Sequence, residues 1–280
     1  MSKRFLIEHL GGLRLTGRDA RAFCQAQFTG DVESWPVDQW QITGWCNSKG
    51  RVLASILASS NEDGVDLILP SEQLEIAKKF SVYAIGRQVE FSDGWFIEGS
   101  FEPAADDKRI AGDATRALRL TRDGTSGSLS ELIQWRIADL CIPLPWLTRE
   151  TTGRYLPQSL GLENNNGLSY TKGCFPGQEV IARVHYLGKV KQHLLAFEFD
   201  AGVDAELAAG DSLLQTTGAL GTEILSSLSV ERTTIGLGVS PIDVTAGIEV
   251  VPASDERGQS GRMATLDRLC YYREKSIKTE

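Results

Sequence analysis

The chain has 280 residues, of which 41% are hydrophobic and 24% charged, and its formal net charge at pH 7 is −8. This composition is typical of a globular protein and excludes a disordered chain, and the acidic balance argues against a protein that binds duplex nucleic acid directly. The length indicates two or three domains of about 100 residues each. No stretch resembles a secretory signal or a membrane span, so we expect a cytoplasmic protein without a membrane partner.

The cysteines and histidines are scattered along the sequence. An odd number of cysteines without a C-x-x-C pair does not indicate a disulfide framework, and three isolated histidines do not predict a zinc or iron site. We therefore expect no resident metal. The five cysteines are Cys24, Cys46, Cys141, Cys174 and Cys270.

A helix is predicted near the start of the chain. The spacing of Thr16 and Asp19 is typical of a helix cap, and apolar residues then recur at helical intervals up to Phe28. Cys24 falls on this apolar stripe. We interpret it as a small buried residue of the core.

The next segment predicts alternating strands and one helix. The expected elements are a hairpin with its turn at residues 47–50, a strand at 65–69, a helix at 70–80, and strands at 82–91 and 95–98. This pattern predicts a small α+β domain over residues 42–111. That domain would be inserted into a first domain made of residues 1–41 and 112–190.

Residues 129–141 carry a helical stripe of apolar side chains that ends before Pro143, which predicts another helix. Trp135 lies off that stripe. Two interpretations of Trp135 stay open, because a tryptophan suits mixed apolar and polar surroundings. It either packs against a neighbouring domain or offers an aromatic face to a flat ligand.

The stretch Lys172–Glu179, of sequence KGCFPGQE, is where we expect any chemistry. Gly173 and Gly177 permit backbone angles closed to other residues, and the proline between them fixes its own φ, so the chain should bend sharply here. Residues 180–194 are predicted to be an extended strand with its cations on one face. A helix over residues 177–186 is the alternative.

Cys174 lies within the predicted bend. A thiol reacts as its thiolate, and the charge of Lys172 together with unpaired N–H groups of the bend would favour that form. Cys174 is therefore a candidate nucleophile, redox thiol or transient cluster ligand. The alternative is a buried structural cysteine.

Residues on both sides of the cysteine would suit a ligand. Lys172 and Arg183 would neutralise an anionic tail, and Gln178 or Glu179 would meet the polar edges of a ring. The alternative for Glu179 is an ordinary surface carboxylate.

Beyond Leu194 the sequence consists of short apolar runs separated by Gly, Asp, Thr and Pro. This spacing predicts a small β-barrel or sandwich over residues 191–280. The sequence contains no G-x-G-x-x-G after a strand, no P-loop and no H-E-x-x-H, so nucleotide-binding and zinc-protease functions lack their motifs.

At Lys172–Glu179 the chain resembles the YgfZ family, folate-binding relatives of the glycine-cleavage T-protein (aminomethyltransferase), whose signature is K-G-C-[YF]-x-G-Q-E. Three further stretches are similar to the family in the same order. They are Gln25–Val32, Cys46–Arg51 and Gly153–Gln158.

The resemblance implies an α+β fold of three lobes around a central opening: a discontinuous first domain, an inserted ferredoxin-like domain and a C-terminal β-barrel. It also implies that the opening binds tetrahydrofolate and that Cys174 supports iron–sulfur enzymes, including those that modify tRNA. The folate-binding residues that it suggests are Lys172, Gly173, Gly177, Gln178, Glu179, Arg183 and Trp135.

Three functions follow as hypotheses. The first is a folate-dependent accessory factor for iron–sulfur enzymes or their assembly proteins. The second is a folate-dependent one-carbon transferase, but Arg51–Ser55 contains no carboxylate where T-proteins carry a catalytic Asp, so aminomethyl transfer is not expected. The third is an interaction protein in which Cys174 is structural.

Overall fold

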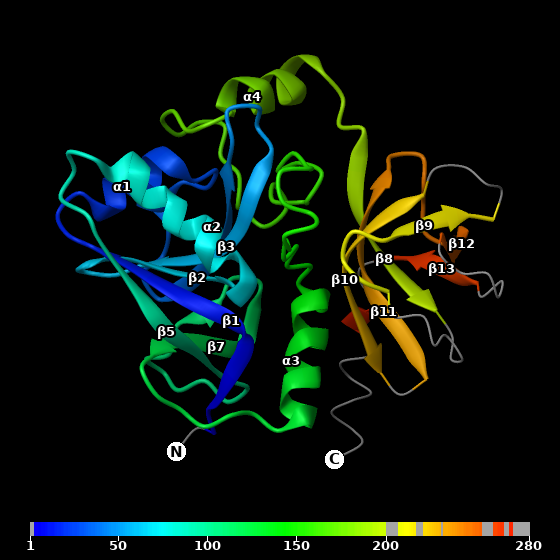
Figure 1. Cartoon of the computed structure of the whole chain (residues 1–280), viewed down its shortest axis with the longest axis horizontal. Coiled ribbons are helices and arrows are strands. Elements are labelled where there is room, and N and C mark those ends of the chain that lie inside the picture. Colours follow the sequence, from blue (N-terminus) through cyan, green and yellow to red (C-terminus); the bar gives the residue numbers. More distant parts are fainter. Residues whose placement is uncertain are drawn as a thin grey trace. The chain divides into compact units, whose positions relative to one another are not determined.

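The computed structural model of the chain describes residues 3–199, 207–216, 221–230, 232–253, 260–265 and 269–270. The chain divides into two compact units, whose helices and strands are labelled in Figure 1. Unit 1 consists of residues 1–127, 146–158 and 162–188, and unit 2 consists of residues 128–145, 159–161 and 189–280.

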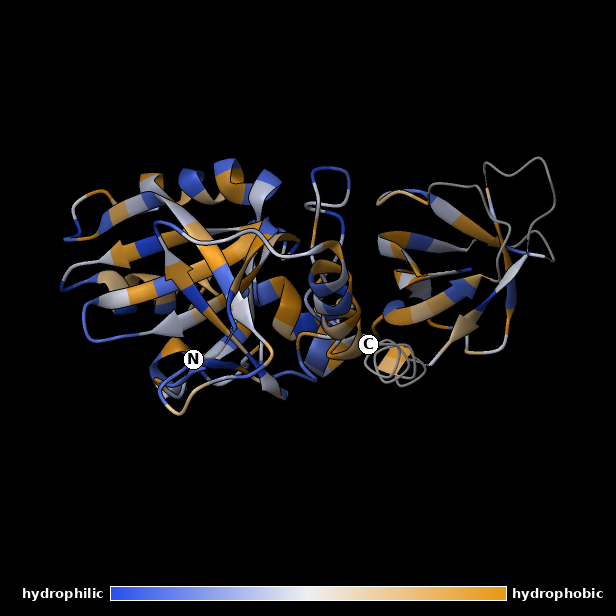
Figure 2. Ribbon diagram, turned by 90° about the horizontal axis from the view of Figure 1, so that it is seen from below, coloured by the Kyte–Doolittle hydropathy of each residue, from blue (hydrophilic) through white to orange (hydrophobic). Residues whose placement is uncertain are grey.

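Unit 1 contains a closed barrel with the strand order β1-β4-β3-β2-β6-β7-β5. The barrel closes because β1 pairs antiparallel with both β4 and β5. Strands β2, β3 and β4 are buried along nearly their whole length, and Figure 2 shows many apolar segments among the strands of the molecule. The strands are β1 (Phe5–Thr16), β2 (Gln39–Cys46), β3 (Val52–Ser60), β4 (Gly64–Pro70), β5 (Glu90–Ser100), β6 (Arg109–Ile110) and β7 (Asp113–Thr121).

Helices and 3₁₀ turns pack against this barrel. Helix α1 buries Phe23, which contacts Phe80 and Phe91 edge-on at ring distances of 5.8 and 5.9 Å. Cys24 is fully buried in the same cluster, which confirms its interpretation as a core residue. The elements are α1 (Ala20–Gln27), α2 (Leu74–Lys78), α4 (Gln178–Leu187) and 3₁₀ turns at Val32–Ser34, Ser71–Gln73 and Lys79–Ala84.

The start of α1 differs from its prediction. Thr16 still belongs to β1, and Asp19 precedes the helix without a capping hydrogen bond from its side chain. The Asp19 carboxylate instead accepts a hydrogen bond from the main-chain N–H of Gln88 at 2.8 Å. It therefore ties the start of the helix to the segment before β5.

Two predicted strands are wrong over much of their length. Residues 180–187 belong to helix α4, and the following strand begins only at Gln192. The β-branched and aromatic side chains of this segment favoured a strand, but the left-handed Gly177 begins a helix whose Ile181 is buried. Likewise, residues 82–84 form a 3₁₀ turn, and β5 starts only at Glu90.

Unit 2 contains α3 and a second closed barrel, with the strand order β10-β11-β8-β13-β12-β9. Ser128 and Glu131 form a reciprocal capping box at the start of α3. The predicted C-terminal β-barrel is thus confirmed, although β13 was not foreseen. The elements are α3 (Leu129–Cys141), β8 (Gln192–Phe199), β9 (Ser212–Gln215), β10 (Thr222–Val230), β11 (Thr233–Pro241), β12 (Glu249–Pro252) and β13 (Gly261–Ala264).

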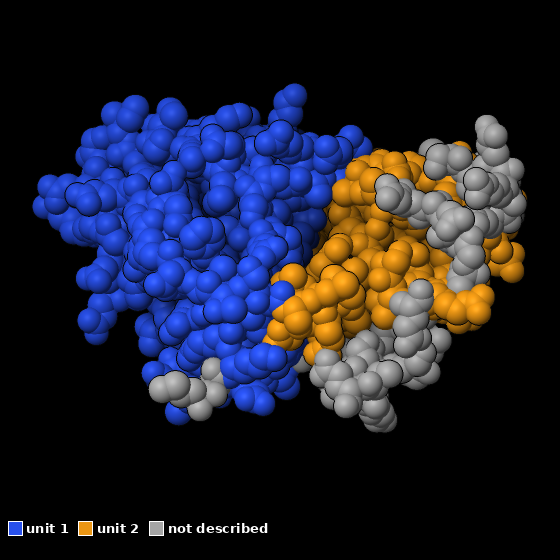
Figure 3. All heavy atoms as spheres, turned by 60° about the horizontal axis from the view of Figure 1, so that its bottom comes forward, with its two compact units in different colours: residues 1–127, 146–158, 162–188 blue, residues 128–145, 159–161, 189–280 orange. Residues whose placement is uncertain are grey.

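The division into three domains stays a prediction, while the T-protein-like α+β architecture is confirmed below. Strand β2 runs from Gln39 to Cys46 across the first predicted boundary, and β6 and β7 pair with each other across the second. Figure 3 colours residues 1–127 as part of a single unit. Strand pairing therefore continues through residues 42–111 into the segments on either side.

Candidate functional site

Lys172 fastens the loop of residues 172–177, here called the signature loop, to the end of α1. Its Nζ donates hydrogen bonds to the main-chain oxygens of Gln25, Phe28 and Gly30 at 2.5, 2.7 and 2.8 Å. The last carbonyls of a helix lack partners within the helix, and a cation there also complements the helix dipole. Burial lowers the pKa of Lys172 to about 8, although Asp31 acts in the opposite direction.

Gly177 brings the other end of the signature loop against the tip of the β2–β3 hairpin. Its φ is +79°, and a Cβ there would lie 2.5 Å from main-chain atoms of Asn47 and Gly50. Gly50 has a φ of +72°, and its own Cβ would lie 3.1 Å from Cγ1 of Ile181. Only a pair of glycines allows the two backbones to approach so closely.

The stretch Gly153–Gln158 holds the same hairpin and the first turns of α4. The main-chain N–H of Val52 donates to the oxygen of Tyr155 at 2.8 Å. Nε2 of Gln158 donates to the main-chain oxygen of Ile181 at 3.0 Å. All four stretches of the sequence resemblance therefore join in one framework around the signature loop in unit 1.

Cys174 is the exposed thiol of this framework. The other two cysteines of unit 1, Cys24 and Cys46, are buried, and burial raises the pKa of both thiols. A buried thiol held in its neutral form is a poor nucleophile. Beside Cys174, a Cβ on Gly173 would meet no atom within 4 Å. The framework thus presents Cys174 to solvent on an open part of the loop.

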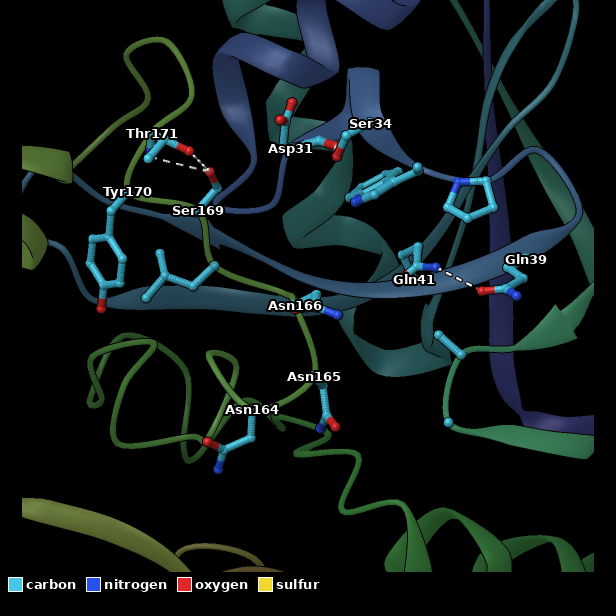
Figure 4. A pocket seen from close by; sticks show the side chains of 15 residues that line it. Asp31, Ser34, Gln39, Gln41, Asn164, Asn165, Asn166, Ser169, Tyr170 and Thr171 are labelled. Carbon is cyan, nitrogen blue, oxygen red and sulfur yellow. Dashed lines mark hydrogen bonds between the residues drawn. The ribbon is translucent and has the colours of Figure 1, made fainter.

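A pocket of about 760 Å³ lies in unit 1, and its wall includes Ser169–Thr171, the residues that immediately precede Lys172. Figure 4 shows the amide side chains of Gln39 and Gln41, which come from β2, and those of Asn164 and Asn165, which come from a loop. The full lining is Asp31, Ser34, Trp35, Pro36, Gln39, Gln41, Ala111, Gly112, Asn164, Asn165, Asn166, Leu168, Ser169, Tyr170 and Thr171.

Buried hydrogen bonds fix the wall of the pocket. The hydroxyl of Thr29 donates to the main-chain oxygen of Gly167 at 2.6 Å, and the N–H of Ser169 donates to the oxygen of Thr29 at 2.9 Å. The N–H of Gly30 donates to the hydroxyl of Thr43 at 2.9 Å. Both threonines are fully buried. These hydrogen bonds therefore hold the pocket wall in place without a ligand.

Tyr170 links the pocket wall to α4. Its ring stacks on that of His185 with centroids 3.8 Å apart and planes inclined by 20°. Its hydroxyl donates a hydrogen bond to Glu163, whose Oε1 also lies 3.5 Å from Nδ1 of His185. Burial, and then the Glu163 carboxylate, raise the pKa of Tyr170. The phenol is therefore a neutral donor at physiological pH.

The residues that the sequence suggested for folate do not gather around this pocket. Lys172 and Gly177 hold the framework, and Gln178 is the half-buried first residue of α4. Glu179 and Arg183 form an ion pair at 3.0 Å on the helix surface, with side chains 88% and 68% exposed. None of these five lines the pocket, and their ligand roles stay predictions.

Trp135 belongs to unit 2 and is fully buried in α3. The interpretation as a packed tryptophan fits this burial. The sequence did not predict that Gln39, Gln41 and Asn164–Asn166 line a pocket. Two amides spaced as one face of a strand and three consecutive asparagines before a glycine were the available signals.

The described residues contain no group of three or more His, Cys, Asp or Glu side chains arranged to hold a metal ion. Among the same residues, no helix is long and apolar enough to cross a membrane.

The fold matches a known class of protein. The structure of aminomethyltransferase T of the glycine cleavage system from Bartonella henselae superposes with a TM-score of 0.68 at 15% sequence identity, covering 94% of this chain and 84% of that one. The chain therefore has the fold of a T-protein aminomethyltransferase.

Several sequence relatives of the chain share one name. The tRNA-modifying protein YgfZ of Colwellia psychrerythraea is 29% identical over 235 residues, which cover 69% of this chain and 71% of that protein. The protein of the same name from Aliivibrio fischeri is 26% identical over 269 residues, which cover 83% of both chains. No protein-family model matches the chain. The chain is thus similar to the YgfZ proteins over most of its length.

Proposed function

We propose that this chain is a tetrahydrofolate-binding accessory factor that supports tRNA modification, and that its pocket holds the pterin ring. The pocket carries this proposal, because its volume of about 760 Å³ falls within the usual range for small-molecule sites. The relatives named as tRNA-modifying proteins support the tRNA part. In this proposal the protein acts in the cytoplasm.

The lining suits a flat ring with polar edges. Amide side chains such as Gln41 and Asn165 both donate and accept hydrogen bonds, as the edge of a pterin does, while Trp35 and Tyr170 add aromatic surface. Asp31 supplies a carboxylate, and none of the described lining residues is a lysine or arginine. The pocket therefore fits the uncharged ring, and the negative glutamate tail would extend outside it.

Cys174 is the residue through which this factor would act on iron–sulfur enzymes or their assembly proteins. Its exposed sulfur sits three residues beyond Thr171 of the pocket wall, on a loop fastened at Lys172 and Gly177. A ligand bound against this wall would lie beside the residues that lead directly into the loop. Folate would tune the presentation of the thiol and would not itself react.

The test combines binding with cellular function. Calorimetric titration should show that tetrahydrofolate binds equally to the wild type and to Cys174→Ala, and that a tetrahydropterin without the glutamate tail competes for the site. In a deletion strain, Cys174→Ala should fail to restore iron–sulfur enzyme activity. Full rescue by this variant would assign Cys174 a structural role, and absence of folate binding would refute the pocket assignment.

The alternative of a one-carbon transferase lacks a candidate base in the expected place. Strand β3, Val52–Ser60, contains no carboxylate. Turnover of an aminomethyl donor that depends on tetrahydrofolate would favour the transferase over the accessory factor.

A further inference from the structure

Two cysteines of unit 2 meet although they are 129 positions apart in the sequence. Cys141 is the last residue of α3. Sγ of Cys270 lies 3.9 Å from the main-chain oxygen of Cys141, and its thiol is the hydrogen-bond donor. The thiol of Cys270 therefore contacts the main chain of Cys141.

Packing fixes both sides of this contact within unit 2. Leu269, the neighbour of Cys270, is fully buried, and so is almost all of Leu140, the neighbour of Cys141. The guanidinium of Arg136 on α3 donates to the main-chain oxygen of Ser227 on β10 at 2.7 Å. This hydrogen bond ties helix α3 to the barrel of unit 2.

The two thiols differ in access from the other cysteines. Cys141 and Cys270 are both half-buried, whereas Cys24 and Cys46 are sealed in the core of unit 1. Cys174 is exposed and belongs to unit 1. A small oxidant can therefore reach the pair in unit 2 without unfolding of the chain.

We infer that Cys141 and Cys270 are a redox modification site that forms a reversible disulfide when a peroxide is the oxidant. One thiolate attacks a peroxide oxygen, the O–O bond breaks, and a sulfenic acid and one water form. The second thiol attacks the sulfenic sulfur, the S–S bond forms, and the sulfenic oxygen leaves as a second water. Both sulfurs are oxidised, the peroxide is reduced, and a dithiol reductant reverses the reaction.

The geometry requires only local adjustment. A main-chain oxygen is about 2.4 Å from its own Cα by standard bond lengths, so Sγ of Cys270, at 3.9 Å from that oxygen, is at most about 6.3 Å from the Cα of Cys141. Rotation about χ1 of each side chain moves its sulfur by a few ångströms. Such rotations bring the sulfurs toward the bond length of about 2.05 Å that a disulfide needs.

The bond would have a defined effect on unit 2. It would close a loop from the end of α3 to residue 270, and closing a long loop reduces the freedom of the unfolded chain. The thermal transition of unit 2 should therefore rise on oxidation. The inference does not depend on folate or on Cys174.

The experiment uses the full chain in a Cys174→Ser background, so that no exposed thiol competes. After treatment with hydrogen peroxide, the intact mass should fall by two hydrogen atoms. A non-reducing tryptic digest should link residues 137–149 to residues 269–273, each of which contains one cysteine. Dithiothreitol should release the link and restore the original melting temperature.

Single substitutions provide the matched controls. Cys141→Ser and Cys270→Ser, each shown to be folded by circular dichroism, should lose the link and should gain oxygen at the remaining thiol. A link through Cys24 or Cys46, a link between two chains, or oxygen addition without any link in the Cys174→Ser chain would overturn the inference.

Discussion

Residues 164–171 and 172–179 are consecutive in the chain but differ in what their side chains contact. The first segment faces a polar pocket with ordinary amides and hydroxyls. In the second, Lys172 binds main-chain oxygens, Gly177 packs against a hairpin, and Cys174 faces solvent. Lys172 and Gly177 of the signature thus hold the backbone in place, and this backbone presents the thiol of Cys174.

The difference teaches how to interpret such a motif. Where two stretches of backbone pass close together, glycine can adopt a positive φ and leaves room for the other stretch. A half-buried lysine can donate hydrogen bonds to the main-chain oxygens at such a place. Ligand contacts are less demanding, since several polar residues can supply them. The signature of this chain therefore marks the support of the site more clearly than its lining.

The largest effect is expected for Lys172→Met. This change removes three hydrogen bonds that the charged Nζ donates. The main-chain oxygens of Gln25, Phe28 and Gly30 then lose this donor. We expect the free energy of unfolding to fall by about 3 kcal/mol. Urea denaturation followed by tryptophan fluorescence measures the change.

Lys49→Met is the matched control, because Lys49 is an exposed residue of the hairpin turn. Its effect should stay within about 0.5 kcal/mol. Equal effects of the two substitutions would contradict a structural role for Lys172.

The second effect compares the two glycines of the signature loop. Gly177→Ala places a Cβ at a φ of +79° and 2.5 Å from the backbone of the hairpin, which should cost about 2 kcal/mol. At Gly173 the added methyl group meets no atom within 4 Å. Gly173→Ala should therefore change stability by less than about 0.5 kcal/mol. A thermal melt of both variants distinguishes them, and similar melting temperatures would refute the close approach at Gly177.

The sequence predicted most of the fold where a pattern was local. The apolar stripe of α1, the hairpin around residues 47–50 and the short strands of the C-terminal barrel all appear in the structure. Helix α4 was predicted only as the alternative to a strand, because its side chains favour a strand and its start depends on the contact between Gly177 and Gly50. No local pattern records that contact.

The candidate site was predicted only in part. The signature located the exposed Cys174, and the order of the motifs identified the stretches that support it. The pocket combines β2 with the loop of Asn164–Asn166, which is more than a hundred residues away, so its lining follows from the tertiary fold alone. The ligand roles inferred for Glu179 and Arg183 rested on nearness in sequence.

A third prediction tests which segment contacts the ligand. Asn165→Ala removes an amide from the pocket lining, so the affinity for tetrahydrofolate should fall about tenfold, or about 1.4 kcal/mol. Arg183→Ala alters the exposed face of α4 and should leave the affinity of the pterin ring unchanged. Isothermal titration measures both. The reverse result would place the ligand at α4 and return the site to the residues suggested by the sequence.

The last effect concerns the pH dependence that Lys172 adds to stability. Its pKa is lowered to about 8 in the folded chain by burial, against an ordinary value of 10.5. Below pH 8 both the folded and the unfolded states hold the proton, and burial of the charge opposes folding. Between about pH 8 and 10.5 the unfolded chain binds more protons, so the free energy of unfolding rises with pH in this window.

The difference in unfolding free energy between the wild type and Lys172→Met isolates this contribution. Lys108, whose pKa burial also lowers, and Lys78, whose pKa Glu75 and Asp93 raise, titrate in both chains and cancel. The difference should therefore increase from pH 8 to pH 10.5 and stay level below pH 8. A difference that stays level up to about pH 10.5 and falls above it would mean that the carbonyl contacts outweigh burial and raise the pKa of Lys172. The protonated form of Lys172 would then stabilise the folded chain.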